Sequence, residues 1–249
     1  MVLGDALVME AGNVTLRKGT LVAGKAWEGP WLLRVAGEGT RVVLQGVRPR
    51  GGGVQIREKA RLQMYQGGVV GCGSHGVACE EGGEAEVVGV EIVECRRNGA
   101  VAKGAGSKLA VREGRIERCK MAGVSCEEGG EAEVAGVEIV ECEGQGARAR
   151  GTGSKLVVRK GRIEQCKVAG VYCTDGGEAE VAGVEIDGCV GPGARVNGAG
   201  SKLAVQEGHI QRCAGGGVEC RAGGSAHLEK LPSKTAGVPA WCRTRAGSP

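Results

Sequence analysis

The sequence is poor in the large and reactive side chains from which compact cores and catalytic sites are usually built. Its 249 residues include no phenylalanine, and aromatic residues make up 2% of the total. Aspartate occurs only at Asp5, Asp175 and Asp187. A globular core of this size needs bulky side chains to fill it. We therefore expect a narrow interior built from Val, Ile, Leu, Ala and Cys.

A strong charge of one sign and long apolar segments are also missing. The 33 basic and 29 acidic residues leave a formal charge of +4, too small to attract nucleic acid or an anionic membrane over a distance. Residues 1–14 lack the charged region and apolar run of a secretory signal, and no segment reaches the length of a membrane span. We predict a protein that contacts neither nucleic acid nor membrane.

Glycine, by contrast, is abundant, with 49 residues, and it marks a repeat of 47 residues. Segments of the form Gly-Val-x-Cys, followed by a turn ending in Gly-Gly and then Glu-Ala-Glu-Val, begin at Gly76, Gly123 and Gly170. Related segments of a second kind begin at Gly99, Gly146 and Gly193. Each unit therefore consists of two coils, of 23 and then 24 residues.

Short runs of alternating residues within each coil predict β-strands. Ala85 and Val87 fall on one face, whereas Glu84 and Glu86 fall on the other, which is the period of a strand; Gly89 then turns the chain. About three strands and three turns in each coil fit a solenoid in which each strand pairs with its equivalent in the next coil. The sequence thus predicts an all-β, right-handed parallel β-helix of about nine to ten coils.

The whole chain up to residue 231 is predicted to be one β-helix domain. Its regular repeats span residues 52–231, and residues 1–51 form diverged coils, the first of them within residues 6–21. Three of the six prolines follow, at Pro232, Pro239 and Pro249, so residues 232–249 are expected to form an irregular tail or cap.

These motifs resemble the right-handed β-helix repeat family, also called carbohydrate-binding and sugar-hydrolase repeats, and the resemblance supplies the predicted handedness. The family's coil typically ends in Asn, where this chain has Cys. The similarity is good over residues 52–231 and loose before them. Relatives include polysaccharide lyases and epimerases with pectate-lyase-like folds, and the substrate-binding regions of F-box ubiquitin-ligase adaptors. The resemblance therefore specifies a fold much better than a function.

Cysteine recurs at two positions of the repeat, which predicts two columns inside the solenoid. One column runs through seven successive coils, at Cys72, Cys95, Cys119, Cys142, Cys166, Cys189 and Cys213. The other occupies every second coil, at Cys79, Cys126, Cys173 and Cys220. Packed free thiols are the favoured interpretation, with disulfides between neighbouring coils as one alternative. A metal site is the other, although columns do not converge on one tetrahedral point. If the thiols are free, the protein is expected in the cytoplasm or another reducing compartment.

Outward positions alternate in charge from one coil to the next. The first such ladder is Glu84, Lys108, Glu131, Lys155, Glu178 and Lys202; the second is Glu91, Arg115, Glu138, Arg162, Glu185 and His209; a third begins Glu80, Lys103, Glu127 and Arg150. Equivalent residues of adjacent strands lie about 4.8 Å apart. We therefore expect cross-strand ion pairs that also determine which coil stacks on which. A phosphate-binding surface is not expected, since acidic rows interrupt the basic ones.

No catalytic, cofactor-binding or metal-binding residue is predicted. The enzymes of the resembling family need clustered Asp, or Asp with Arg, Lys, His or Tyr, and the three aspartates here are distant in the repeat. His75 lies between Cys72 and Cys79, but its repeat equivalents are not histidines, so a lone turn histidine is expected rather than a zinc ligand. Trp27 and Trp31 are expected to cover the open N-terminal end, with a sugar or peptide platform as the alternative.

The predicted function is that of a non-catalytic scaffold, without a cofactor, that binds another protein. The resemblance implies substrate binding of the ubiquitin-ligase adaptor type as one form of this function. The alternative is a carbohydrate-binding or polysaccharide-active β-helix protein, related to lyases, hydrolases or epimerases. That alternative predicts an exposed cluster of aromatic and acidic residues along one groove.

Overall fold

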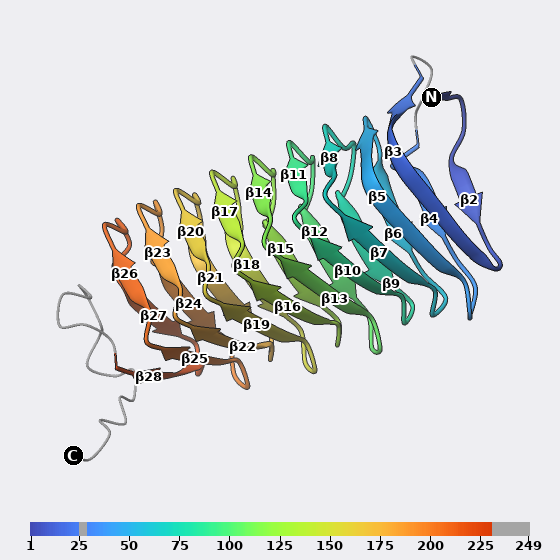
Figure 1. Ribbon diagram of the computed structural model, residues 1–249. Helices are drawn as coiled ribbons and strands as arrows, with labels where there is room; N and C mark the ends of the chain where they lie inside the picture. The colour runs from blue at the N-terminus through green and yellow to red at the C-terminus, as the bar shows by residue number, and fades with distance from the viewer. Residues whose placement is uncertain (25–28, 231–249) are drawn as a thin grey trace.

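The computed structural model describes residues 1–24 and 29–230, and every regular element in these ranges is a β-strand. Trp27 and the predicted tail at residues 232–249 lie outside the described residues. The coils stack in chain order along a rod, with β2 near one end and β27 and β28 near the other (Figure 1).

One regular coil contains three strands joined by tight turns, as predicted. The coil that begins at Gly76 consists of β9 (Val77–Glu80), β10 (Glu84–Val88) and β11 (Glu91–Val93). Each strand pairs in parallel with the equivalent strand of the next coil, so that β10 pairs with β13 (Lys108–Arg112). The strands of this coil are only three to five residues long because glycines and pairs of polar residues interrupt each apolar run.

The strands form two sheets, which we call sheet A and sheet B. Sheet B has ten strands, one from each coil, which agrees with the predicted nine to ten coils. Its strands are β2 (Leu7–Met9), β4 (Trp31–Val35), β6 (Gly53–Ile56), β9, β12 (Ala100–Lys103), β15 (Val124–Glu127), β18 (Gln145–Arg150), β21 (Ala169–Thr174), β24 (Ala194–Asn197) and β27 (Val218–Arg221).

Sheet A has 18 strands and combines the other two strands of each regular coil; the last coil contributes only β28. Two long strands join these two sets: β5 runs unbroken from Arg41 to Arg50 and pairs with both strands of the following coil. The strands of sheet A are β1 (Val2–Leu3), β3 (Asn13–Ala23), β5, β7 (Arg61–Tyr65), β8 (Gly68–Val70), β10, β11, β13, β14 (Arg115–Glu117), β16 (Glu131–Ala135), β17 (Glu138–Val140), β19 (Lys155–Arg159), β20 (Arg162–Glu164), β22 (Glu178–Ala182), β23 (Glu185–Asp187), β25 (Lys202–Gln206), β26 (His209–Gln211) and β28 (Ser225–Glu229).

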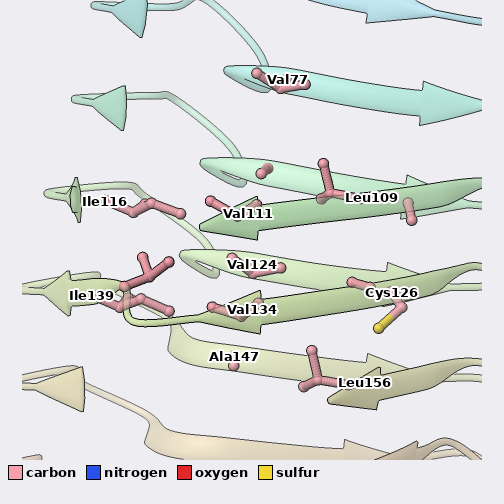
Figure 2. Packing of buried hydrophobic residues seen from close by; sticks show 14 of the residues in the cluster. Val77, Leu109, Val111, Ile116, Val124, Cys126, Val134, Ile139, Ala147 and Leu156 are labelled. Atoms are coloured by element: carbon pink, nitrogen blue, oxygen red, sulfur yellow. The ribbon is translucent and has the colours of Figure 1, made fainter. Parts of the chain in front are cut away.

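The core is a narrow stack of equivalent layers between the two sheets. Ile116 and Ile139 occupy the same position in successive coils and are fully buried. Figure 2 shows these isoleucines beside Val111 and Val134, with side chains of sheet B such as Val124 among the same buried cluster. Medium-sized aliphatic side chains fill the space, as the composition predicted, because each layer is only one strand thick.

The glycine that opens each segment of the repeat is required by close packing. A Cβ on Gly146 would lie 2.3 Å from Ile163 Cγ2 and 2.7 Å from the carbonyl oxygen of Gly170. At this position the chain therefore passes too near a core side chain of its own coil and the backbone of the next coil to carry any side chain. The equivalent glycines are Gly99, Gly123, Gly170 and Gly193.

A buried serine in alternate coils fastens the turn between the two sheets. Ser154 Oγ donates a hydrogen bond of 2.7 Å to the carbonyl oxygen of Arg150 and accepts one of 3.0 Å from Gly129 N in the preceding coil. Ser107 and Ser201 make the same pair of contacts. These bonds satisfy backbone groups at the turn and connect neighbouring coils.

Candidate functional site

The outer face of sheet A carries an open groove of about 990 Å³ that crosses seven strands, from β3 to β19. One charged or polar residue from each strand forms a row along it: Asn13, Arg41, Arg61, Glu84, Lys108, Glu131 and Lys155. Because alternate residues of a strand point to opposite faces, this row lies opposite the core layers. The groove therefore places charges of both signs on a regular grid.

The predicted charge ladders have the predicted register. Residues Glu84 to Lys202 of the first ladder are consecutive partners across β10, β13, β16, β19, β22 and β25. The second ladder follows the shorter strands of sheet A from β11 to β26. The third lies on sheet B, from β9 to β18. Alternating charges thus face each other in adjacent coils.

Ion pairs along the first ladder form near its ends but not at its centre. Arg61 Nε lies 2.9 Å from Glu84 Oε2, and Lys202 Nζ lies 2.7 Å from Glu178 Oε1. Within residues 1–24 and 29–230, Lys108, Glu131 and Lys155 have no ion-pair partner within 4.0 Å. The expectation of a continuous line of pairs is therefore wrong for these three. An exposed pair gains too little to hold two long side chains in one geometry.

The second ladder shows that pairing is possible in the same coils. Arg115 Nη1 lies 2.5 Å from Glu138 Oε2, and Arg162 Nη2 lies 2.8 Å from Glu185 Oε2. The neighbouring Glu185 and Glu164 carboxylates raise the pKa of the Arg162 guanidinium. The second ladder thus pairs at its centre, where the first does not. In the third ladder the expected pairs are replaced by others, of Lys103 with Glu128, Glu127 with Arg148 and Arg150 with Asp175.

Two further rows on the grooved face alternate in size as well as charge. The middle row is Glu86, Ala110, Glu133, Val157, Glu180 and Ala204, and the third row is Val88, Arg112, Ala135, Arg159, Ala182 and Gln206. Arg112 bridges Glu86 at 2.7 Å and Glu133 at 3.5 Å. Long side chains therefore stand next to small ones in each row.

The outer face of sheet B holds a part-buried polar network that the repeat did not reveal. Arg148 pairs with Glu127 and donates a 3.1 Å hydrogen bond from Nε to Ser125 Oγ. The Arg148 and Glu127 side chains are only 11% and 19% exposed. Burial opposes ionisation of Glu127, but the charge of Arg148 and the hydroxyl of Ser125 lower its pKa overall. A guanidinium and a carboxylate are therefore held ionised in a partly dry environment.

His75 lies in the turn before β9, as expected, and is buried at the edge of the same network. Its Nδ1 accepts a 3.2 Å hydrogen bond from Asn98 N, and its ring stacks on Trp31 with 6.1 Å between centroids. Burial, followed by the charges of Arg97 and Arg148, lowers the pKa of His75 to about 4. Trp31 thus stacks on a coil two steps along the solenoid instead of covering its open end.

A second cluster on sheet B lies nearer the C-terminal end. Glu219 accepts 2.6 Å hydrogen bonds from Arg195 Nε and Arg221 Nε, and the Arg195 guanidinium lies 5.9 Å from the ring centroid of Tyr172. Both sheet B clusters use one outward position, which runs Ala78, Val101, Ser125, Arg148, Tyr172, Arg195 and Glu219. The residue type at this outward position changes from coil to coil, whereas the other columns repeat. This irregularity was the sequence signal that could have revealed the two clusters.

Both predicted cysteine columns are present. In the first, the residue after each cysteine donates its N–H to the carbonyl of the cysteine one coil earlier, as Glu143 does to Cys119 at 2.8 Å. Ten cysteines of the described coils are free, all buried except the half-buried Cys213. Hydrogen bonds with the flanking cysteines raise the pKa of Cys95 and Cys142. Cys220 departs from the free-thiol expectation because it is disulfide-bonded.

The structure does not bring the three aspartates together. Asp175 pairs with Arg150 at 3.1 Å, and Asp187 pairs with Arg212, whose hydrogen bond lowers the Asp187 pKa. Asp5 accepts a hydrogen bond of 2.7 Å from Ala6 N near the N-terminus. The Asp187 carboxylate is therefore held ionised by its arginine, which suits an ion pair rather than proton donation.

Comparison with known proteins defines the class of fold. A family described as the right-handed β-helix region matches residues 128–230. Together with the ten coils and parallel sheets, this match makes the chain a right-handed parallel β-helix protein, as predicted. No curated protein matches the sequence. The described residues include no helix long and apolar enough to cross a membrane.

Structural comparison matches the chain with two solved structures. The ORF18 protein of Geobacillus virus E2 is 12% identical with a TM-score of 0.50; the alignment covers 90% of this chain and 54% of that one, so this chain spans about half of its length. At this identity the likeness to the viral protein extends to the fold alone. A TibC-catalysed hyper-glycosylated fragment of TibA, residues 55–350, is 13% identical with a TM-score of 0.32 and coverages of 95% and 96%.

Proposed function

We propose that this chain is a non-catalytic β-helix scaffold that binds another protein through the outer face of sheet A. The observation that carries the proposal is the set of three unpaired charges, Lys108, Glu131 and Lys155, on the grooved face. Charges that have no internal partner can form ion pairs with a ligand without first breaking existing ones. A protein partner can present both signs in a matching order.

A carbohydrate ligand is less well supported by the same groove. Sugar rings bind to exposed aromatic faces, because these bury apolar area while polar groups nearby bind the hydroxyls. The residues that line the groove include no aromatic side chain.

Selection from a displayed library of random peptides tests the proposal. The immobilised chain should enrich charged peptides, and Lys108→Glu with Lys155→Glu should weaken their binding by at least about tenfold. Arg115→Glu with Arg162→Glu changes the same net charge on the same two coils and should leave binding nearly unchanged. A glycan array serves as the counter-test. Binding of glycans without any peptide enrichment, or equal peptide binding by both double variants, would overturn the proposal.

The non-catalytic part of the proposal has its own test. Incubation with pectate, polygalacturonate or alginate, with and without calcium, should give no unsaturated or shortened products above a blank. Turnover that is abolished by replacing a single residue would show that the chain is an enzyme.

We also propose a reducing compartment: the ten free thiols of the described coils support it, whereas the Cys220 disulfide argues against it. Protein isolated without oxygen and without added reductant, and then denatured, should titrate with about ten thiols. Recovery of mostly oxidised cysteines would contradict this assignment.

A further inference from the structure

We infer that the partner which this face fits is a second copy of the chain, bound face to face with the two solenoid axes antiparallel. The inference rests on the proposed use of the sheet A face for protein binding. A two-fold axis parallel to the strands, midway between β16 and β19, relates the two copies. This rotation places β16 of one copy against β19 of the other, β13 against β22, and β10 against β25.

The first row is its own charge complement when reversed. From β10 to β25 it reads minus, plus, minus, plus, minus, plus. The two-fold axis sets Glu131 against Lys155 of the second copy, Lys108 against its Glu178, and Glu84 against its Lys202. All six positions then face an opposite charge. The three central residues that lack an ion-pair partner within the chain all gain one.

The middle row is complementary in size under the same operation. Glu133 faces Val157 of the second copy, Ala110 faces its Glu180, and Glu86 faces its Ala204. Every glutamate of this row thus meets a small side chain and no carboxylate. Like charges at this close spacing would repel, and two long side chains could not occupy the same space.

The third row follows the same rule. Arg112 faces Ala182 of the second copy, and Ala135 faces its Arg159, so each arginine again meets a methyl group. The remaining pair joins Val88 to Gln206. A two-fold axis parallel to the solenoid axis would instead reverse the strand direction. It would set each glutamate of the middle row against itself, and Lys108 and Lys155 of the first row against Arg112 and Arg159 of the third. The sequence of the face therefore selects the antiparallel dimer.

The size of the face sets the expected strength of association. Six strands about 4.8 Å apart and five residues long give a footprint of roughly 24 Å by 16 Å on each copy. That is on the order of 400 Å² per copy, about half of what each partner buries in a stable specific interface, and it is typical of weak, transient association. The dimer should therefore be weak, populated at high protein concentration, and strengthened at low ionic strength, where screening is least.

Sedimentation velocity at about 0.5 mM protein and low salt tests the inference. The wild-type chain should form dimers that dissociate as salt is added. Lys155→Glu alone places two pairs of glutamates in contact across the axis, and Glu131→Lys alone places two pairs of lysines there. Each variant by itself should lose dimerisation by at least about tenfold.

An equimolar mixture of these two variants should recover the dimer. In the mixture, the native Glu131 of one chain meets the native Lys155 of the other, and the two substituted residues form the second opposite pair. Arg162→Glu and Glu138→Lys, which change the second ladder of the same coils, serve as controls and should dimerise like the wild type. Circular dichroism of each variant confirms that its strands are retained.

The outcomes separate this inference from the proposed function. A wild-type chain that stays monomeric at low salt overturns the inference, and the proposed function then stands if selected peptides still require Lys108 and Lys155. Dimers that form equally in each single variant also overturn it, because the ladder is then not the interface. Recovery in the mixture, with loss in each variant alone, establishes the antiparallel pairing.

Discussion

The interior of the solenoid and the outer face of sheet A differ in what changes from one coil to the next. Inside, every position stays apolar: Ile116, Ile139 and Ile163 recur in the shorter strands of sheet A, and in the longer strands Ala and Leu alternate. Outside, the first ladder changes sign in every coil, so that its true period is two coils. The comparison teaches that core packing determines the shape of each coil, whereas the outer positions are left to serve pairing and recognition.

The largest loss of stability should come from a substitution in the buried core. Ile139 is fully buried in β17, and Ile139→Ala should lower the free energy of unfolding by about 3 to 4 kcal/mol because it removes apolar contacts and leaves a cavity. Glu138→Ala, one residue earlier and facing outward, should cost under about 1 kcal/mol. Urea unfolding of both variants measures the contrast; equal losses would contradict the division between inside and outside.

The sheet B network is intermediate, because its charges point outward yet are largely covered. Arg148→Ala leaves the Glu127 carboxylate part-buried without its guanidinium and should cost about 2 to 3 kcal/mol. Arg150→Ala lies two residues along the same strand, where the Arg150 and Asp175 side chains are 58% and 57% exposed, and should cost under about 1 kcal/mol. The denaturant midpoints of the two variants measure these losses of stability. A larger loss of stability for Arg150→Ala than for Arg148→Ala would refute the assigned role of burial.

A smaller effect should appear as pH dependence at His75. In the folded chain its pKa is about 4, below its ordinary value of about 6.5. Between these values the unfolded chain binds more protons, so stability falls as the pH is lowered. The loss from pH 6.5 to pH 5 should be about 1.5 kcal/mol. His75→Asn keeps an acceptor for Asn98 N and should remove most of this slope; an unchanged slope would place the titration elsewhere.

Much of the fold could be predicted because its information is periodic. Glycines at Gly76, Gly123 and Gly170 gave the coil length, and alternation within the Glu84 to Val87 run gave strands. Aligning the coils was then enough to predict the register of both cysteine columns and of the three ladders. Sequence also gave the number of coils to within one.

The contacts that break the repeat could not be predicted in this way. Trp31 and His75 meet across two coils, and neither residue type recurs at its position. The pair of Arg148 with Glu127 lies in a column whose residue type changes from each coil to the next, with arginine at Arg148 and Arg195. Whether a ladder charge forms an ion pair is a matter of side-chain conformation, which register alone does not determine. The unpaired state of Lys108, Glu131 and Lys155 therefore emerged only from the structure.

The central claim is that these three charges serve a partner rather than the fold. The most direct test neutralises them together, as Lys108→Gln, Glu131→Gln and Lys155→Gln in one chain, and measures urea stability and selected-peptide binding on the same preparation. We predict that the free energy of unfolding changes by less than about 0.5 kcal/mol, while peptide binding falls at least about tenfold. A loss of more than about 1.5 kcal/mol with binding intact would show that the ladder braces the solenoid and would contradict the account.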